Sequence, residues 1–462
     1  MYLGLKDSGM TLGEIISVTH GEPHNFPDGE SYVFNICTDT RGDVGSSLFV
    51  ALCGESFDGH DFIPEAYEKG AVCALSEKEI ETDKPFIIVK NTLKAYGEIA
   101  AAYKKKFKTL TIAVTGSVGK TTTKEVVCAV LGTKYKVCKT KENHNNEVGL
   151  PETLLSLNAS HQIAVVEIGM AARGEISSLS KIASPDISII TNVGSSHIGQ
   201  LGSRENILKA KMEITDGMKD DGILLVSGDD KLLRSVKKTH TYRFFVGIDD
   251  SRSDFWANNV RRKHSGMTFD FSYRGETLRD LFIPSLGKHS VYAASFAAAC
   301  GMICGLSESE IKAGLSSYVP VDLRQSITEK NDLKIIDDCY NASPESMRAS
   351  IDVLKYINMN EHRRAVAVLG EMCELGAFAP QLHKSVGEYA IKNVDELFLF
   401  GAGENILKIK EGFEAHGGRA VMLGDDVDAA EKILLSKIKK GDAVLFKASR
   451  AVRLERLSEK FK

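Results

Sequence analysis

One segment constrains the fold more than any other. The run TGSVGKTT, from Thr115 to Thr122, follows a short apolar stretch and precedes a helical one. A strand, a glycine-rich turn and a helix in this order form a phosphate-binding loop, in which backbone N–H groups at the start of the helix face an anion. Val114 stands where such loops usually carry a further glycine, so this loop is a shortened variant. The arrangement predicts a parallel α/β sheet with helices on both faces.

The side chains of this loop suit a magnesium nucleotide. Glycine lets the backbone approach a phosphate, Lys120 can reach the terminal phosphates, and the hydroxyl of Thr121 can bind Mg²⁺. A glycine-rich turn without any ligand is the alternative, which GKTT between a strand and a helix makes the weaker one. The predicted ATP contacts within the loop are Gly116, Ser117, Gly119, Lys120, Thr121 and Thr122.

The whole chain repeats an α/β rhythm in three units. Its 462 residues fit three domains of about 150 residues each, and we expect boundaries that give units 1–107, 108–318 and 319–462. Alternating polar and apolar residues at 254–283 predict an antiparallel hairpin inserted late in the second unit. Strands are expected at 47–52, 71–75, 109–114, 163–168, 186–191, 222–227, 333–337, 365–369, 397–400 and 442–446, and a helix at 62–70.

Composition excludes several classes of protein. The net charge is −4 and no dense basic run occurs, which argues against nucleic-acid binding. No window of about 18 apolar residues predicts a membrane span, and residues 1–10 lack the pattern of a signal peptide. Nine cysteines without a C-x-x-C pair indicate free thiols in a reducing cytosol, so we expect a cytoplasmic protein. The lysine run at 104–108 is most simply a solvated linker face.

Two further residues are candidates for metal binding near the loop. Glu167 ends the strand expected at 163–168, and His197 follows the strand expected at 186–191. In a parallel sheet the carboxyl ends of the strands face the ligand crevice, so both side chains are expected near the loop. The alternatives are a solvent-exposed carboxylate for Glu167 and a hydrogen-bonded structural role for His197.

Several motifs in a fixed order resemble one family, the Mur ligases, which are ATP-dependent amino-acid ligases of peptidoglycan synthesis. The similarity extends over nearly the whole chain. The motifs are TDTR (38–41), TKENHNNEVGLP (140–151), VEIGMAARGEI (166–176), DDCYNASP (337–344), and GEMCELG (370–376) with His383.

The resemblance implies a fold and a reaction. The fold has a small N-terminal α/β uridine-nucleotide domain, a central parallel-sheet domain that binds ATP, and a C-terminal Rossmann-like domain. ATP phosphorylates the terminal carboxylate of UDP-N-acetylmuramoyl-tripeptide, and the amine of D-alanyl-D-alanine attacks the acyl phosphate. The products are an amide, ADP and phosphate, in a cytoplasmic step of peptidoglycan precursor synthesis that supports the cell wall, cell shape and cell division.

The resemblance also implies two magnesium ions. Thr121 and Glu167 would hold the first, and His197 would help to hold the second. Lys211 matches a lysine that relatives carry as a carbamate, which converts a cation into an oxygen ligand suited to Mg²⁺. Residue spacing alone favours a plainer interpretation, in which Lys209 and Lys211 lie on an exposed helix face. Lys120, His197 and Lys211 are therefore the expected catalytic residues.

The remaining implied contacts lie in all three units. Arg324 and Asp338 would contact phosphate and ribose across a cleft that must close. Further ATP contacts are expected at His289 and Asn341, peptide contacts at Asn143, Asn145 and Asn146, uridine diphosphate contacts at Thr40 and Arg41, and dipeptide contacts at Lys447 and Ser449.

The chain departs from the family pattern in two places, and other functions remain open. Ser290 and Ala293 stand where relatives often carry asparagines near adenine, and Ala448 replaces a glycine. The alternatives are another amide ligase of this superfamily, such as one that adds a diamino acid or a folate polyglutamate synthase, and a nucleotide-binding regulator without ligase activity. A monomer is expected, since three domains complete the site.

Overall fold

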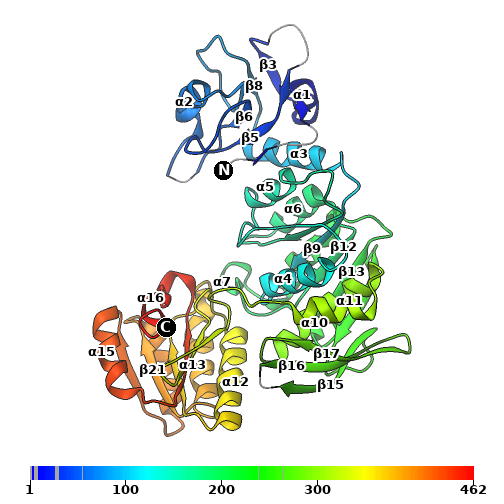
Figure 1. The fold of residues 1–462 in the computed structure, drawn as a ribbon. Coiled ribbons are helices and arrows are strands. Elements are labelled where there is room, and N and C mark those ends of the chain that lie inside the picture. The colour runs from blue at the N-terminus through cyan, green and yellow to red at the C-terminus, as the bar shows by residue number, and fades with distance from the viewer. Residues whose placement is uncertain (1–2, 5–8, 27–30, 55, 238, 264) are drawn as a thin grey trace.

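The computed structural model describes residues 3–4, 9–26, 31–54, 56–237, 239–263 and 265–462. Figure 1 shows three α/β units, with the N-terminal unit at one end, the central unit beneath it and the C-terminal unit beside the central one. Residues 1–10, where no signal peptide is expected, lie partly outside the described residues. Within the described ranges, no helix is both long and apolar enough to cross a membrane.

The N-terminal unit is built on a six-stranded sheet in the order β1-β5-β6-β7-β8-β3. Strands β5 to β8 are parallel, and the two edge strands pair antiparallel. The strands and the helix expected here are confirmed, with bounds shifted by a few residues. The bounds are β1 (Leu3–Gly4), β3 (Glu22–His24), β5 (Asn35–Cys37), β6 (Ser47–Val50), β7 (Cys73–Ser76), β8 (Phe86–Ile88), α1 (Leu12–Thr19) and α2 (Ile63–Glu68).

Helix α3 (Thr92–Lys104) joins the first two units. At its start, the hydroxyl of Thr92 donates to the carbonyl of Ala51 at 2.8 Å, inside the N-terminal unit. Near its end, the hydroxyl of Tyr103 donates to the carbonyl of Leu157 at 2.9 Å, inside the central unit. Most apolar side chains of the helix are buried, among them Tyr96. The helix therefore packs on both units.

The interpretation of the lysine run at 104–108 as a solvated linker face is wrong for Lys104. Its ammonium group donates to the carbonyl of Ser184 at 2.9 Å and also contacts the carbonyl of Ala183, at the end of helix α6 (Glu175–Ala183). Burial lowers the pKa of Lys104 to about 8. The ammonium group thus caps a helix C-terminus, where a cation is favoured by the carbonyl dipoles.

The central unit contains a nine-stranded sheet in the order β10-β11-β9-β12-β13-β14-β15-β16-β17. Its strands are parallel from β10 to β15 and antiparallel from there on. The expected strands are confirmed as β9 (Leu110–Thr115), β11 (Ile163–Glu167), β12 (Ile187–Ile190) and β13 (Ile223–Ser227). Strands β10 (Val137–Lys139) and β14 (Tyr242–Gly247) were not predicted.

Residues 254–283 form more than the single inserted hairpin that was expected. They fold as three antiparallel strands, β15 (Phe255–Lys263), β16 (Gly266–Tyr273) and β17 (Glu276–Ile283). Because β15 pairs in parallel with β14, these strands extend the main sheet. The alternating pattern predicted strands in this segment. Their attachment to the main sheet depends on β14, which was not predicted.

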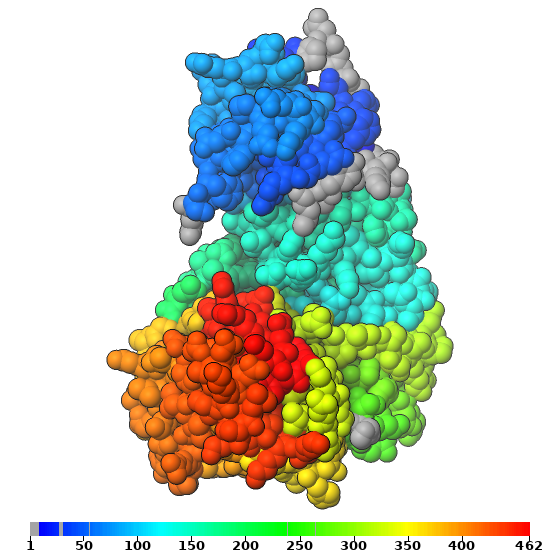
Figure 2. All heavy atoms as spheres, turned by 60° about the vertical axis from the view of Figure 1, so that its left-hand side comes forward, coloured from blue at the N-terminus to red at the C-terminus, as the bar shows by residue number. Residues whose placement is uncertain are grey.

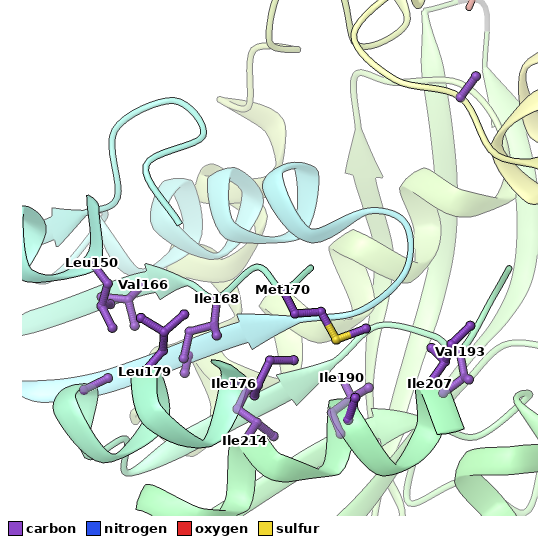
Figure 3. Packing of buried hydrophobic residues seen from close by; sticks show 14 of the residues in the cluster. Leu150, Val166, Ile168, Met170, Ile176, Leu179, Ile190, Val193, Ile207 and Ile214 are labelled. Carbon is purple, nitrogen blue, oxygen red and sulfur yellow. The ribbon is translucent and has the colours of Figure 1, made fainter. Parts of the chain in front are cut away.

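Helices cover both faces of the central sheet, as predicted. Side chains alternate along β9: Ile112 and Val114 belong to the core under helices α4 (Lys120–Leu131), α10 (Lys288–Ile303) and α11 (Glu308–Ser316), while Ala113 belongs to the opposite core. Figure 3 shows that second core, in which Ile176 and Leu179 of α6 lie beside Val166 and Ile190 of the sheet. Burial on both faces explains the continuous apolar strands.

The C-terminal unit has a six-stranded sheet in the order β18-β19-β23-β20-β21-β22. All pairs except β18 with β19 are parallel. The four expected strands are confirmed as β19 (Leu333–Asp337), β20 (Ala365–Leu369), β21 (Glu396–Phe400) and β23 (Ala443–Lys447), whereas β18 (Ser326–Lys330) and β22 (Ala420–Gly424) were missed. Because β23 lies between β19 and β20, the carboxyl ends of these strands meet at a crevice.

The C-terminal unit rests against the central unit, as the space-filling view also shows (Figure 2). The backbone N–H and the hydroxyl of Ser195 donate to the carboxylate of Glu345 at 2.9 and 2.8 Å. Glu345 lies in the first turn of α12 (Pro344–Glu361). The cleft between these two units, which was expected to close over a nucleotide, is therefore bridged in this structure.

Candidate active site

The phosphate loop adopts the backbone that its glycines permit. Gly119 has φ +82° and caps the start of α4, so a left-handed residue is required there. Gly116 has φ +149°, and a Cβ at this position would lie 1.9 Å from the hydroxyl oxygen of Thr191. The amide of Val118 donates to the side-chain oxygen of Asn192 at 3.0 Å. The loop is thus held by the end of β12, and Gly116 is needed for that packing as well as for any phosphate.

Lys120 lies at the start of α4, and its ammonium group points back over the loop. Its Nζ donates to the carbonyl of Gly116 at 3.0 Å. Burial lowers the pKa of Lys120, with a contribution from the positive charge of Arg324 and an opposing one from Glu167. A cation held in this way attracts an anion strongly, because little water screens it.

Glu167 is a buried carboxylate, so the alternative of a solvent-exposed strand end is wrong. It is 1% exposed. One carboxylate oxygen accepts from the hydroxyl of Thr121 at 2.7 Å, and the other accepts from the side-chain amide of Asn145 at 2.8 Å. Hydroxyl and carboxylate oxygens are ligands that Mg²⁺ binds in proteins. The sequence prediction that Thr121 and Glu167 lie together holds geometrically.

His197 lies in the same region and faces the C-terminal unit. It has φ +63° and precedes the short helix α7 (Ile198–Leu201). Its Nδ1 lies 2.8 Å from a carboxylate oxygen of Glu374, within ion-pair distance but outside the angle for a hydrogen bond. The contact with Glu374 was not predicted, although Glu374 belongs to the GEMCELG motif.

Lys211 lies in helix α8 (Arg204–Met212) and is buried, so the interpretation that it lies on an exposed helix face is wrong. Lys209 of the same helix is exposed. Among the described residues, the Nζ of Lys211 has no hydrogen-bond partner. Burial places the pKa of Lys211 well below its ordinary value. The positive charge of Lys120 lowers it further and Glu213 opposes the shift. A buried amine without a partner is unusual, because an unsatisfied polar group costs free energy.

Arg324, Asp338 and Lys447 of the C-terminal unit line the same cavity as the loop. The ammonium group of Lys447 donates to the carboxylate of Asp338 at 2.7 Å and to the carbonyl of Asn341 at 3.0 Å. The guanidinium carbon of Arg324 lies 3.8 Å from the ring centre of Tyr340, which fixes its direction. Asp338 and Asn341, predicted as ATP contacts, thus follow β19, while Lys447, predicted as a dipeptide contact, ends β23 and Arg324 precedes β18.

A single cavity of about 820 Å³ connects the two units. Its volume lies within the ordinary range for small-molecule sites, about 300–1,000 Å³. The predicted site residues that line it are Ser117, Gly119, Lys120, Thr121, Thr122, Asn143, Asn145, Glu167, His197, His289, Arg324, Asp338, Asn341 and Lys447.

Six predicted site residues do not line this cavity: Gly116, Asn146, Lys211, Ser449, Thr40 and Arg41. The side-chain oxygen of Asn146 accepts from the amide of Gly149 at 3.0 Å, at the start of helix α5 (Gly149–Leu155). The hydroxyl of Ser449 accepts from the amide of Cys373 at 2.8 Å. In the N-terminal unit, Thr40 is buried and Arg41 is exposed.

The helix that was expected to receive adenine also lines the cavity. Ser290 and Ala293 both face it, and the hydroxyl of Ser290 donates to the carbonyl of Leu286 at 3.0 Å. The hydroxyl of Tyr292 contacts the carboxylate of Asp229, which also accepts from nearby backbone amides. Asp229 was not predicted, because nothing in its sequence surroundings distinguishes it from other acidic loop residues.

A second group of polar side chains lies in the N-terminal unit. The reactive atoms of Cys53, Asp58 and His60 lie within 4.8 Å of one another. However, the Nε2 of His60 accepts from the amide of Glu77 at 2.9 Å, so its Nδ1 carries the proton and donates to Asp58 at 2.5 Å. A metal ligand needs a free lone pair on the ring, so this imidazole is structural.

Known proteins resemble the chain along its length. Three family models match successive parts of it. They are Mur ligase family, catalytic domain, at 33–112; Mur ligase middle domain, at 114–301; and Mur ligase, glutamate ligase domain, at 324–450. UDP-N-acetylmuramoyl-tripeptide--D-alanyl-D-alanine ligase of Bacillus subtilis (strain 168) is 38% identical, over 97% of each chain. MurF from Acinetobacter baumannii is 28% identical with a TM-score of 0.88 over 98% of each chain. MurF ligase from Thermotoga maritima, solved in complex with ADP, is 31% identical with a TM-score of 0.84 over 92% of this chain and 96% of that chain.

Proposed function

Because this chain belongs to the Mur ligase family, we propose that it adds D-alanyl-D-alanine to UDP-N-acetylmuramoyl-tripeptide. ATP drives the reaction, which forms ADP and phosphate. One observation carries the proposal: a single cavity brings the phosphate loop of the central unit opposite Arg324, Asp338 and Lys447 of the C-terminal unit. A nucleotide-binding module alone has no need for a second domain whose charged residues face the phosphates.

The chemistry consists of two displacements. In the first, an oxygen of the peptide carboxylate bonds to the γ-phosphorus of ATP and ADP leaves. The N–H groups of the loop and Lys120 hold the phosphates and stabilise the charge that spreads over the transferring group. In the second, the amine of D-alanyl-D-alanine bonds to the activated carbonyl carbon, phosphate leaves and the nitrogen loses a proton. Closed packing of the two units keeps water from the acyl phosphate.

Two magnesium ions fit the residues present. Thr121 and Glu167 would hold one ion through their oxygens, and His197 and a carbamylated Lys211 would hold the other. When bound, these ions would neutralise phosphate charge. The support for the carbamate is that Lys211 is buried without a hydrogen-bond partner among the described residues. Its amine can add to CO₂, which forms a nitrogen–carbon bond and releases a proton. The resulting carbamate has oxygen atoms that could bind a metal ion.

The three units would divide the substrates among them. We assign the uridine diphosphate group to unit 1–107 with Thr40 and Arg41, ATP to unit 108–318, and the dipeptide to unit 319–462 with Lys447 and Ser449. Asn143, Asn145 and Asn146 would lie near the peptide. The enzyme would act as a cytoplasmic monomer, since one chain supplies every part of the cavity.

The direct test is phosphate release from ATP by the purified protein with Mg²⁺ and UDP-N-acetylmuramoyl-tripeptide, with and without D-alanyl-D-alanine. Release that depends on both substrates is the expected result. Release with a different amine acceptor would indicate another ligase of the superfamily. Nucleotide binding without any release would contradict the proposal and favour a regulator.

A further inference from the structure

The central and C-terminal units touch where the short helix α7 packs tightly against residues 374–376. The amide of Gly199 donates to the carbonyl of Glu374 at 3.1 Å. A Cβ on Gly199 would lie 2.6 Å from the backbone nitrogen of Gly376, so the two backbones meet without room for a side chain. His197 directly precedes α7, and Glu374 lies in the facing segment of the C-terminal unit. These two side chains meet at the edge of the active-site cavity, which both line.

The backbone at Glu374 is held by its surroundings, while the side chain is half exposed. It has φ +65°, which is strained for a residue other than glycine, and such strain persists only where the surroundings fix the backbone. The amide of Met372 donates to the Nε2 of His383 at 2.9 Å, and the amide of Cys373 donates to the hydroxyl of Ser449 at 2.8 Å. These two bonds hold the backbone just before Glu374, and so place its side chain beside His197.

The carboxylate of Glu374 approaches a particular atom of His197. One oxygen lies 2.8 Å from Nδ1, while the other makes no hydrogen bond to any residue that the structure describes. A histidine that binds a metal commonly has its second ring nitrogen held by a carboxylate, which fixes the orientation of the ring and leaves the first nitrogen free. The carboxylate of Glu374, supplied by the opposite domain, lies at such a distance from Nδ1 of His197, although the angle in this structure is not that of a hydrogen bond.

We propose that Glu374 is a positioning residue, carried by the C-terminal unit, that orients His197 so that its Nε2 faces the metal nucleotide. The inference rests on the proposed function, since it requires a metal nucleotide in this cavity. Its consequence is a coupling between domains: the metal site is complete only when the C-terminal unit, which carries the proposed dipeptide contacts, has docked. ATP would then be used only when the acceptor domain is in place.

The test uses the full-length protein and Mn²⁺ with the non-hydrolysable analogue AMP-PCP. Free Mn²⁺ is measured by electron paramagnetic resonance, and small-angle scattering reports whether the units stay docked. The variant is Glu374→Gln, which changes one atom. Its matched control is Glu371→Gln in the same loop, because the carboxylate of Glu371 accepts from Asn405 at 2.5 Å and is not paired with His197.

The expected result is an apparent Mn²⁺ affinity about tenfold weaker in Glu374→Gln, with unchanged scattering and with a wild-type affinity in Glu371→Gln. An unchanged affinity in Glu374→Gln would overturn the inference. A loss of affinity accompanied by an open scattering profile would also overturn it, because docking alone would then explain the effect. Failure of the wild-type protein to bind Mn²⁺ with AMP-PCP would contradict the proposed function itself.

Discussion

Replacing Lys211 with methionine should stabilise the protein and abolish ligation. The side chain of Lys211 is 0% exposed, and its Nζ has no hydrogen-bond partner among the described residues. Leaving a buried polar group unpaired costs about 1–3 kcal/mol, and methionine fills similar space without a polar end. We therefore expect the free energy of unfolding to rise by ~1–3 kcal/mol, while the proposed carbamate ligand is lost.

Differential scanning calorimetry without nucleotide, in buffer depleted of CO₂, measures the stability gained by Lys211→Met before any carbamate forms in the wild type. For a unit of about 150–250 residues, 1 kcal/mol moves the unfolding midpoint by about 2–4 °C, so a rise of at least about 2 °C is expected. The gain should shrink as pH rises toward the ordinary lysine pKa of about 10.4. Because burial lowers the pKa of Lys211 in the folded state, the unfolded chain binds more protons below that pH, and the wild type gains stability as pH rises.

Lys209→Met is the matched control, since Lys209 is exposed in the same helix. It should change stability by less than about 0.5 kcal/mol and keep its activity. A midpoint for Lys211→Met at or below that of the wild type would refute the reasoning, because it would mean that the buried ammonium group is compensated in the folded protein.

Three other substitutions test the remaining parts of the site and the fold. Lys120→Ala should lower ATP-dependent phosphate release by about 10²–10³-fold with an unchanged melting midpoint, and near-normal turnover would contradict the nucleotide assignment. Lys211→Ala should regain part of its activity with added acetate, and a folded variant that does not respond would count against the carbamate. The pKa of Lys104 is lowered to about 8 in the folded protein. The free energy of unfolding of the wild type, relative to that of Lys104→Met, should therefore rise between pH 8 and about 10.4. A difference in unfolding midpoint that stays flat across this range would show that Lys104 is not buried as described.

Local patterns predicted the parts of the fold that depend on local structure. The phosphate loop combines a strand, glycines and a helix start within a few residues, so Gly119 and Lys120 could be placed from sequence. Strands β19 and β20 were predicted with their observed bounds, because parallel strands buried on both faces form continuous apolar runs. Strand β18 escaped prediction, since its residues are mostly exposed on a sheet edge.

Contacts between distant segments were harder to predict. The burial of Lys104 depends on the end of α6, which its own charged surroundings do not suggest. Lys211 and Lys209 look alike in sequence, and only the packing of α8 separates the buried residue from the exposed one. Glu374 meets His197 through the docking of two domains, so no pattern within either loop could indicate the contact.

Helix α3 has a consequence for synthesis of the chain on the ribosome. Its buried face includes Tyr96 and Tyr103, and it packs largely on α5 and α6 of the central unit. Gly97 lies so close to Ile182 that a Cβ would come within 2.6 Å. The N-terminal unit therefore emerges with an uncovered aromatic surface, which stays open until translation has passed the end of α6. Such transiently exposed apolar surface is where nascent chains aggregate or bind chaperones, and slower translation between residues 104 and 183 would prolong that period.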